Sequence, residues 1–338
     1  MLMALFCSLA LGEIQINIIS FLFSQISPPQ SLLVHHDFLH TIFFDIRLPR
    51  TLLAGLIGCL LAVSGVMMQG VFRNPLADPS LIGVTAGASL GASLMILFGQ
   101  YLPILSNHLE LIGLTLTTLG ACIGGGLTVI IVYNIATQKS SINTTGTSVT
   151  SMLLTGIAIT AIVAGISNLL DFFSDNTYLR RMSLWRMGSL EGANYFHVIL
   201  AISVCFTFLC ILPKQAKSLN AILLGESEAR HLGIDIIKTK RHIILLTALG
   251  IGIAVSLAGT IGFIGLLVPH LMRLLVGPNH RILLPASALA GAALLMFADT
   301  AARTLVSPTE LPVGVITAFL GAPIFIWLVR HRYEFGAN

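Results

Sequence analysis

The sequence predicts an all-α protein that crosses a membrane about ten times. Hydrophobic residues make up 55% of the 338-residue chain and charged residues only 9%, whereas soluble domains carry about a quarter charged residues. So few charges do not cover a soluble core, and lipid is the expected solvent for most of the surface. Apolar runs of about 20 residues, which is the length of a bilayer-spanning helix, recur without the alternation that marks strands.

Nine apolar runs have a suitable length, and a tenth is shorter. The short run, at about 263–277, is interrupted by Pro269 and carries His270 and Arg273, so we expect a short or broken eighth helix. Together they make one transmembrane domain over residues 1–338. The other predicted helices lie at about 2–24, 51–72, 81–99, 111–136, 150–170, 194–213, 242–262, 283–301 and 311–329.

Two features of the runs bear on how they pack. The first run has no basic region before it and no clear cleavage site, which predicts a retained helix rather than a signal peptide. Small residues such as Gly83, Gly87 and Gly91, at four-residue spacing, and the triplet 124–126 favour close helix contacts in lipid.

Basic residues sort by type when the helices are threaded in alternation. One side receives all five lysines, among them Lys214 and Lys240, and seven arginines. The positive-inside rule makes that side the cytoplasm and places both termini there. Six arginines are left for the outer side, where their planar forks suit carboxylates of a protein or a substrate; the simpler reading is interfacial snorkelling. These six are Arg47, Arg50, Arg180, Arg181, Arg186 and Arg303.

The longest polar stretch, at about 214–241, is predicted to lie in the cytoplasm. A short helix from Glu226 to Leu232, stopped by Gly233, fits its sequence. Such a surface helix is a natural docking element for another protein, although a solvated loop is the alternative.

Several activities lack support in the sequence. It contains no phosphate-binding loop of the G-x-x-x-x-G-K-[ST] type, so we expect no ATPase in this chain. It also contains no H-E-x-x-H, so we expect no metalloprotease of that type either. Ion-coupled secondary transporters usually place carboxylates at the middle of the membrane. Such residues are scarce in the predicted helices, and Asp299 lies near a helix end, so the sequence gives little support to a secondary transporter. The polar docking segment argues against a passive channel. The five cysteines lie in apolar runs and predict neither a disulfide nor a metal site.

Motifs along most of the chain resemble one family. The sequence is similar to the type II permeases of bacterial ABC importers, the FecCD/BtuC-like group that moves iron–siderophore, haem or cobalamin, over about residues 45–330. The motifs are Arg47-Leu48-Pro49-Arg50, Ser64-Gly65 with Gln69, Arg73-Asn74-Pro75-Leu76-Ala77-Asp78-Pro79, Leu224-Gly225-Glu226, Gly262-Phe263-Ile264-Gly265-Leu266, Val268-Pro269-His270, Ala298-Asp299, Glu310-Leu311-Pro312 and Gly321-Ala322-Pro323.

The resemblance implies an assembly in the bacterial inner membrane. It implies a homodimer with ten helices per subunit, two ATP-binding subunits below it that use ATP and Mg, and a periplasmic binding protein above it, with no nucleic acid and no cofactor in this chain. By motif position, Arg47, Arg50 and Arg303 would dock the binding protein. The fifth helix would line the pore. The ATPase-coupling residues would be Glu226, Ala229, Leu232 and Gly233.

The ligand is less clearly marked. Haem is flat and apolar, carries two propionates, and holds an iron that accepts Met or His, which favours it here. A ferric siderophore and, behind it, cobalamin remain open alternatives, and helical methionines are commonly packing residues. Residues that would suit an entrance or path for haem are Arg180, Arg181, Trp185, Met187, Met67 and Met68, with His35, His36 and His40 on the outer side.

Overall fold

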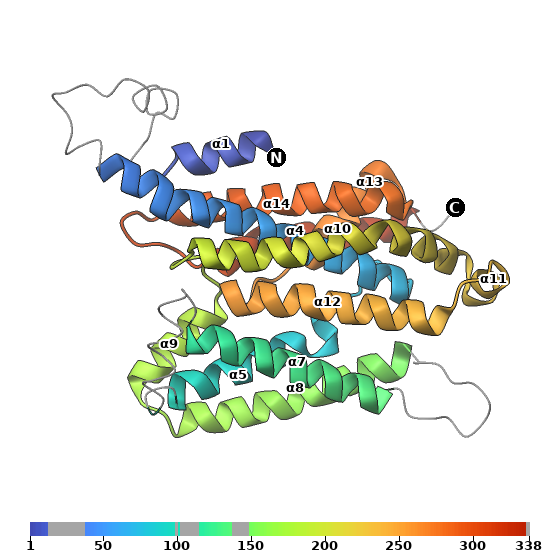
Figure 1. The fold of residues 1–338 in the computed structure, drawn as a ribbon, viewed down its shortest axis with the longest axis horizontal. Coiled ribbons are helices and arrows are strands. Elements are labelled where there is room, and N and C mark those ends of the chain that lie inside the picture. The colour runs from blue at the N-terminus through green and yellow to red at the C-terminus, as the bar shows by residue number, and fades with distance from the viewer. Residues whose placement is uncertain (13–37, 99–100, 102–114, 137–148, 336–338) are drawn as a thin grey trace.

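A computed structural model describes residues 1–12, 38–98, 101, 115–136 and 149–335. Every regular element within these ranges is a helix, which confirms the all-α fold class. The long helices lie side by side along one axis of the molecule (Figure 1). Residues 13–24 of the predicted first helix, together with His35, His36 and Lys139, fall outside the described ranges.

The helices follow the predicted order, and six of them in the described part are long and apolar enough to span a membrane. The elements are α1 (Leu2–Ala10), η1 (Thr41–Arg47), α4 (Leu48–Phe72), η2 (Pro79–Ile82), α5 (Val84–Phe98), α7 (Leu116–Ala136), α8 (Val149–Phe172), α9 (Asn176–Arg186), α10 (Tyr195–Leu224), α11 (Glu226–His231), α12 (Ile236–Ala258), α13 (Ile264–Val276), α14 (His280–Thr304) and α15 (Val313–Phe335).

Helix α4 is the centre of the bundle. It packs along α14, α10, α12 and α13, and most of its side chains are buried. Glycines let these backbones approach: a Cβ on Gly58 would collide with the carbonyl of Gly291 in α14, and one on Gly65 with the carbonyl of Gly265 in α13. Small residues, rather than large apolar ones, therefore set the closest contacts.

Helices α5 and α7 form a second tight pair. Gly87 and Gly91 of α5 approach the backbones of Gly124 and Gly120 in α7 so closely that a Cβ would not fit. The predicted close packing of these glycines is thereby confirmed. Gly83 differs from the expectation, because it ends η2 with φ +79 instead of lying within a helix.

Several boundaries differ from the sequence expectation. Helix α1 ends at Ala10, with Leu11 extended, instead of continuing to about residue 24, and α12 covers Ile236–Ala258 instead of about 242–262. Helix α10 continues to Leu224, past Pro213, because buried positions such as Ala216, Leu219 and Ile222 carry its packing face onward. Proline removes one backbone donor, and here the packing outweighs that loss. Helix α9 was not predicted as a separate element; Asp175 caps its first turn by accepting from the Tyr178 N–H at 2.8 Å.

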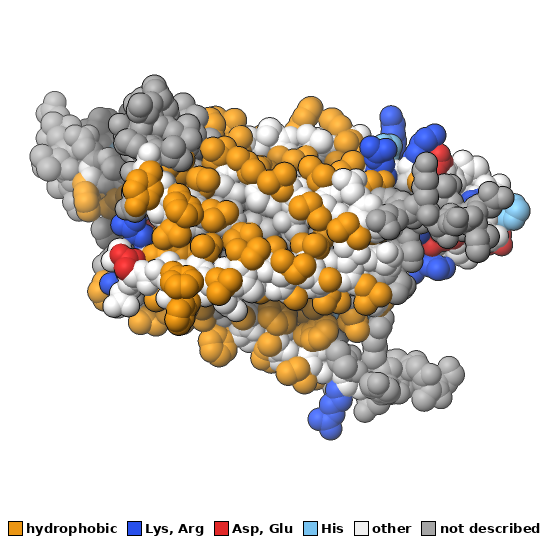
Figure 2. Space-filling view, turned by 90° about the horizontal axis from the view of Figure 1, so that it is seen from below, with side chains coloured by type: hydrophobic (Ala, Val, Ile, Leu, Met, Phe, Trp, Pro, Cys, Tyr) orange, Lys and Arg blue, Asp and Glu red, His pale blue; other side chains and the backbone are white. Residues whose placement is uncertain are grey.

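The charges gather at the two ends of the bundle, with an apolar belt between them (Figure 2). We call the end with α9 and the α14–α15 loop the arginine end. We call the end with α11 the lysine end, because the neighbouring parts of α10 and α12 carry four lysines: Lys214, Lys217, Lys238 and Lys240. Which end faces the cytoplasm stays a prediction from the positive-inside rule.

Candidate functional site

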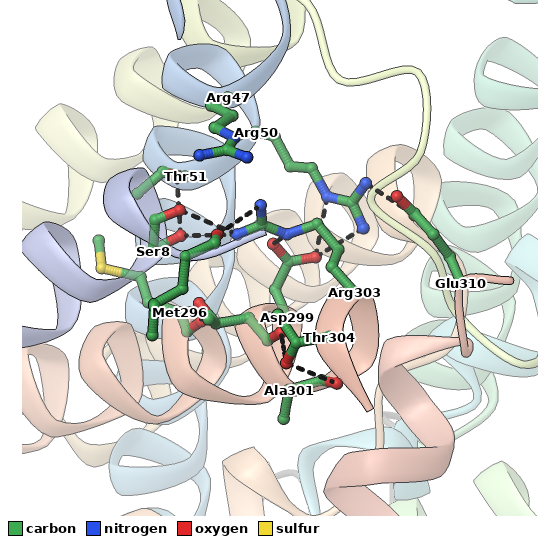
Figure 3. A network of polar contacts seen from close by, with 12 residues as sticks. Ser8, Arg47, Arg50, Thr51, Met296, Asp299, Ala301, Arg303, Thr304 and Glu310 are labelled. Atoms are coloured by element: carbon green, nitrogen blue, oxygen red, sulfur yellow. Dashed lines mark hydrogen bonds and ion pairs between the residues drawn. The ribbon is translucent and has the colours of Figure 1, made fainter. Parts of the chain in front are cut away.

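Three arginines predicted to dock a partner lie in one cluster where α1, α4 and α14 meet (Figure 3). Arg47, Arg50 and Arg303 expose only 5%, 7% and 8% of their surface. The sequence predicted arginines that are accessible to a partner, whereas in the structure all three are buried. Guanidinium groups removed from water need carboxylates or carbonyls as partners, and each of the three finds them within the chain.

Asp299 is the buried anion of this cluster. Its carboxylate lies 2.9 Å from Nη2 of Arg50 and 3.1 Å from Nε of Arg303, and its side chain is fully buried. Glu310, in the α14–α15 loop, accepts from Nη1 of Arg50 at 2.8 Å with 43% of its side chain exposed. One guanidinium therefore joins a buried and a half-exposed carboxylate.

The other two arginines fasten α1 to the bundle. Arg303 donates to the backbone carbonyl and the hydroxyl of Ser8 at 3.1 Å. Arg47 donates to the carbonyls of Leu9 and Ala10 at 2.9 and 3.2 Å. These contacts satisfy carbonyls at the end of α1 that lack helical partners. The docking role of the three arginines stays a prediction, and the structure adds that all three also bind their own chain.

A groove of about 580 Å³ lies between the end of α9, the α12–α13 turn and one face of α15. Its lining is mostly apolar, and Arg186 is the charged residue in it. Other lining residues are Met187, Thr260, Gly314, Phe319 and Pro323. Arg186 is held by an ion pair with Asp171 at 2.9 Å. The groove can receive a flat apolar ligand and offers one thioether and one guanidinium.

The predicted entrance residues separate into different places. Met187 lines the groove and is exposed. Arg180 and Arg181 are exposed on α9. Trp185 and Arg181 line a second pocket, of about 690 Å³, between α9 and the ends of α5, α7 and α12.

Met67 and Met68 lie in α4 with no exposed surface. Met67 packs in a cluster with Val204 and Phe208, and Met68 in one with Ile82 and Met152. Both are packing residues in this conformation, as helical methionines commonly are, and neither lines an open path in it. His40 lies before η1, where its ring contacts that of Phe44.

At the lysine end, α11 begins at Glu226 as expected and is followed by Gly233 with φ +79. Ala229 is fully buried against Ala221, Ile222 and Ile236. Leu232, by contrast, is 64% exposed. The four predicted coupling residues thus divide between a face held by the chain and a face open to a partner.

Glu226 is held by an ion pair that the sequence did not reveal. Lys240 of α12, with a buried side chain, donates to it at 2.9 Å. That ammonium holds the pKa of the Glu226 carboxyl below its usual range, so the pair is intact at neutral pH. Neither this pair nor the Arg50–Glu310 pair could be predicted from sequence, because their members are 14 and 260 residues apart. The Asp299–Arg303 pair was readable, since its members are four residues apart on one helix.

Comparison with known proteins gives a consistent picture. Residues 1–331 match the FecCD transport family. The hemin transport system permease protein HmuU of Yersinia pestis is 41% identical over 98% of this chain and 95% of its own. The cobalamin import system permease protein BtuC of Halobacterium salinarum is 40% identical over 85% of this chain and 73% of its own.

A solved structure supports the same fold. The chain superposes with a TM-score of 0.79 on one described as an inward-facing metal-chelate type ABC transporter, at 30% identity over 97% of this chain and 96% of the other. PsaBC from Streptococcus pneumoniae, at 15% identity and a TM-score of 0.55, is similar in fold alone.

Proposed function

The chain belongs to the FecCD transport family of ABC importer permeases, and from that premise we propose that it carries haem across the bacterial inner membrane. In this proposal both termini are cytoplasmic and the lysine end faces the cytoplasm. The chain supplies the path, and separate subunits that use ATP and Mg supply the energy.

The observation that carries the choice of haem is the groove beside α15. A porphyrin presents a flat apolar face to such walls, and an apolar site with few polar groups is the usual form of a small-molecule site. Met187 would offer a thioether to the iron, and Arg186, while paired with Asp171, would offer its remaining donors to a propionate. The hemin permease HmuU, 41% identical over nearly the whole chain, supports the same substrate.

Cobalamin and ferric siderophores are the competing substrates. Relatives named as cobalamin permeases are nearly as similar, at 40% identity. Cobalamin is larger and richer in amide groups than haem, and its recognition calls for more hydrogen-bonding side chains. The groove offers few of these besides Arg186 and Thr260, which is why haem is preferred.

We place the path between two copies of this chain. Helix α8 is apolar but mostly uncovered within the chain: Leu154, Ile162 and Leu169 are each more than half exposed. The face of α15 beside the groove is also open, with Phe319 at 75% exposed. A second copy placed against α8 and α15 would close the groove into a passage.

The partner subunits are assigned to opposite ends. The ATPase subunits would dock on α11, which is flanked by two exposed apolar side chains, Leu224 at the end of α10 and Leu232. The binding protein would dock on the arginine end, with carboxylates facing arginines. ATP binding would draw the two ATPases together, move α11 with them and tilt the helices that line the path.

The substrate is tested by transport in proteoliposomes that contain the permease, its ATPase and its binding protein. We expect ATP-dependent uptake of haem, with much slower uptake of cobalamin and of a ferric hydroxamate siderophore. Uptake of cobalamin or the siderophore without uptake of haem would overturn the substrate. Uptake that persists without the ATPase, driven by an ion gradient, would overturn the transporter class and favour a secondary carrier.

The lysine-end assignment is tested by a matched pair of variants. Leu232→Ser changes an exposed side chain and is expected to weaken ATPase binding, whereas Leu274→Ser changes an equally exposed leucine, 64% in both cases, on α13. Pull-down of the ATPase measures the difference. Equal binding by both variants would contradict docking at α11.

A further inference from the structure

Arg50 has two carboxylate partners that differ sharply in accessibility. Asp299 is fully buried between Arg50 and Arg303, while Glu310 is 43% exposed on the α14–α15 loop. The loop residues 305–310 are all exposed. The Glu310-Leu311-Pro312 motif belongs to this loop, and the proposed function gives it no role so far.

We propose that Glu310 is a placeholder: in the undocked permease it occupies the position on Arg50 that a carboxylate of the binding protein takes on docking. The inference rests on the proposed function, since it requires a partner at the arginine end. Docking then exchanges one carboxylate for another on Nη1 of Arg50, and the buried pair with Asp299 is kept.

Only Glu310 is suited to such an exchange. Removing Asp299 from the cluster would leave two buried guanidinium groups short of an anion, which is strongly unfavourable. A half-exposed ion pair contributes little net free energy, because water and other carboxylates compete for the same donor. Arg50 would remain paired throughout, so no buried charge is exposed at any stage of the exchange.

The backbone around Glu310 allows it to leave without unravelling the loop. The next residue, Leu311, donates its N–H to the carbonyl of Ala302 at 3.0 Å and so fastens the loop to α14. Glu310 therefore needs only a side-chain rotation to release Arg50. The consequence is an internal competitor that lowers the affinity of the docked complex and favours release of the binding protein after delivery.

The test compares two variants of the complete importer that each remove one negative charge from the arginine end. Glu310→Gln removes the competitor but keeps an acceptor for Arg50. Glu191→Gln changes another exposed carboxylate at the same end and controls for a general change of surface charge. Binding-protein association and dissociation rates are measured on the permease–ATPase complex in nanodiscs.

We expect Glu310→Gln to tighten binding by about two- to fivefold, the size expected from an exposed ion pair, mainly through slower dissociation. Glu191→Gln should change affinity less and act on the association rate, as rim charges do. The inference is overturned if Glu310→Gln, with wild-type thermal stability, leaves affinity unchanged or weakens it, or if Glu191→Gln tightens binding equally.

A different result would identify a failure of the proposed function itself. If the wild-type complex and both variants fail to bind the binding protein, the docking assignment and this inference both fall. If wild type binds and only the predicted gain is missing, docking stands and the placeholder role is wrong.

Discussion

Helices α4 and α8 have nearly the same length, 25 and 24 residues, and both are apolar enough to span a membrane. Their surroundings are opposite. About 83% of the most apolar stretch of the helix that contains α4 is buried, against 17% for α8. One helix is the scaffold of the bundle, and the other presents its surface to lipid or to a second copy.

The difference teaches that hydropathy does not separate core from surface in a membrane protein, because lipid is as apolar as the core. Small residues carry the missing information. Gly55, Gly58 and Gly65 of α4 each meet a neighbouring helix at close range. In α8, Gly156 meets the carbonyl of Leu81 on the covered side, whereas Gly165 has open space where a Cβ would stand. The buried arginine cluster marks α4 in the same way, since it fixes the arginine end of that helix.

The largest loss of stability is expected from disrupting the ion pairs that hold α4 at the arginine end. Asp299→Ala leaves the guanidinium groups of Arg50 and Arg303 buried with one anion fewer, and should cost about 3–5 kcal/mol of stability. The exposed pair Asp235–Lys238, joined at 3.0 Å at the lysine end, provides the control.

Asp235→Ala removes an exposed ion pair and the cap of α12, so it should cost much less stability than Asp299→Ala. Unfolding in detergent, followed by heat or denaturant, measures both variants. Equal losses would show that the arginine cluster does not anchor α4.

A smaller effect is expected from adding one methyl group to each helix. Gly65→Ala forces a Cβ against the carbonyl of Gly265, so α4 and α13 must separate, at a cost of about 1–3 kcal/mol. Gly165→Ala meets nothing within 4 Å and should be neutral or stabilising by up to about 1 kcal/mol through helix propensity. The same unfolding measurement compares them, and equal stability of the two variants would contradict the assignment of α4 as the tightly packed helix.

Much of the fold could be predicted from the sequence because length and apolarity define a spanning helix. The order of helices, the close packing of the glycines in α5 and the short helix at Glu226 follow from local patterns, whereas the pairing of α5 with α7 does not. The full length of α10 does not, because tertiary contacts carry it past Pro213. Local rules end a helix at proline, and only the packing of later residues shows that it continues.

The candidate site was only partly predictable, for a physical reason. Charge sorting marked Arg50 as important, but its partner Glu310 lies 260 residues away in sequence, and one sequence carries no record of that proximity. The same holds for the burial of Lys240. Residue type therefore indicated which groups matter, and the fold decides whether they face a partner or their own chain.

The smallest effect on stability, and the sharpest test of where the substrate passes, comes from two methionines. Met67 is enclosed in α4, and Met187 is 43% exposed at the groove. Replacement by leucine keeps the volume and removes the sulfur, so either variant should lose less than about 1.5 kcal/mol of stability. Any change in transport then reports on the thioether rather than on packing.

We expect Met67→Leu to transport haem like wild type, since its sulfur contacts only protein. Met187→Leu should slow haem uptake, because the iron loses a soft ligand on its way through the groove. Initial rates in proteoliposomes, with ATPase activity measured alongside, separate a transport defect from a coupling defect. Reduced uptake for Met67→Leu with normal uptake for Met187→Leu would move the path from the α8–α15 side to α4, and the contrast between scaffold and path would be reversed.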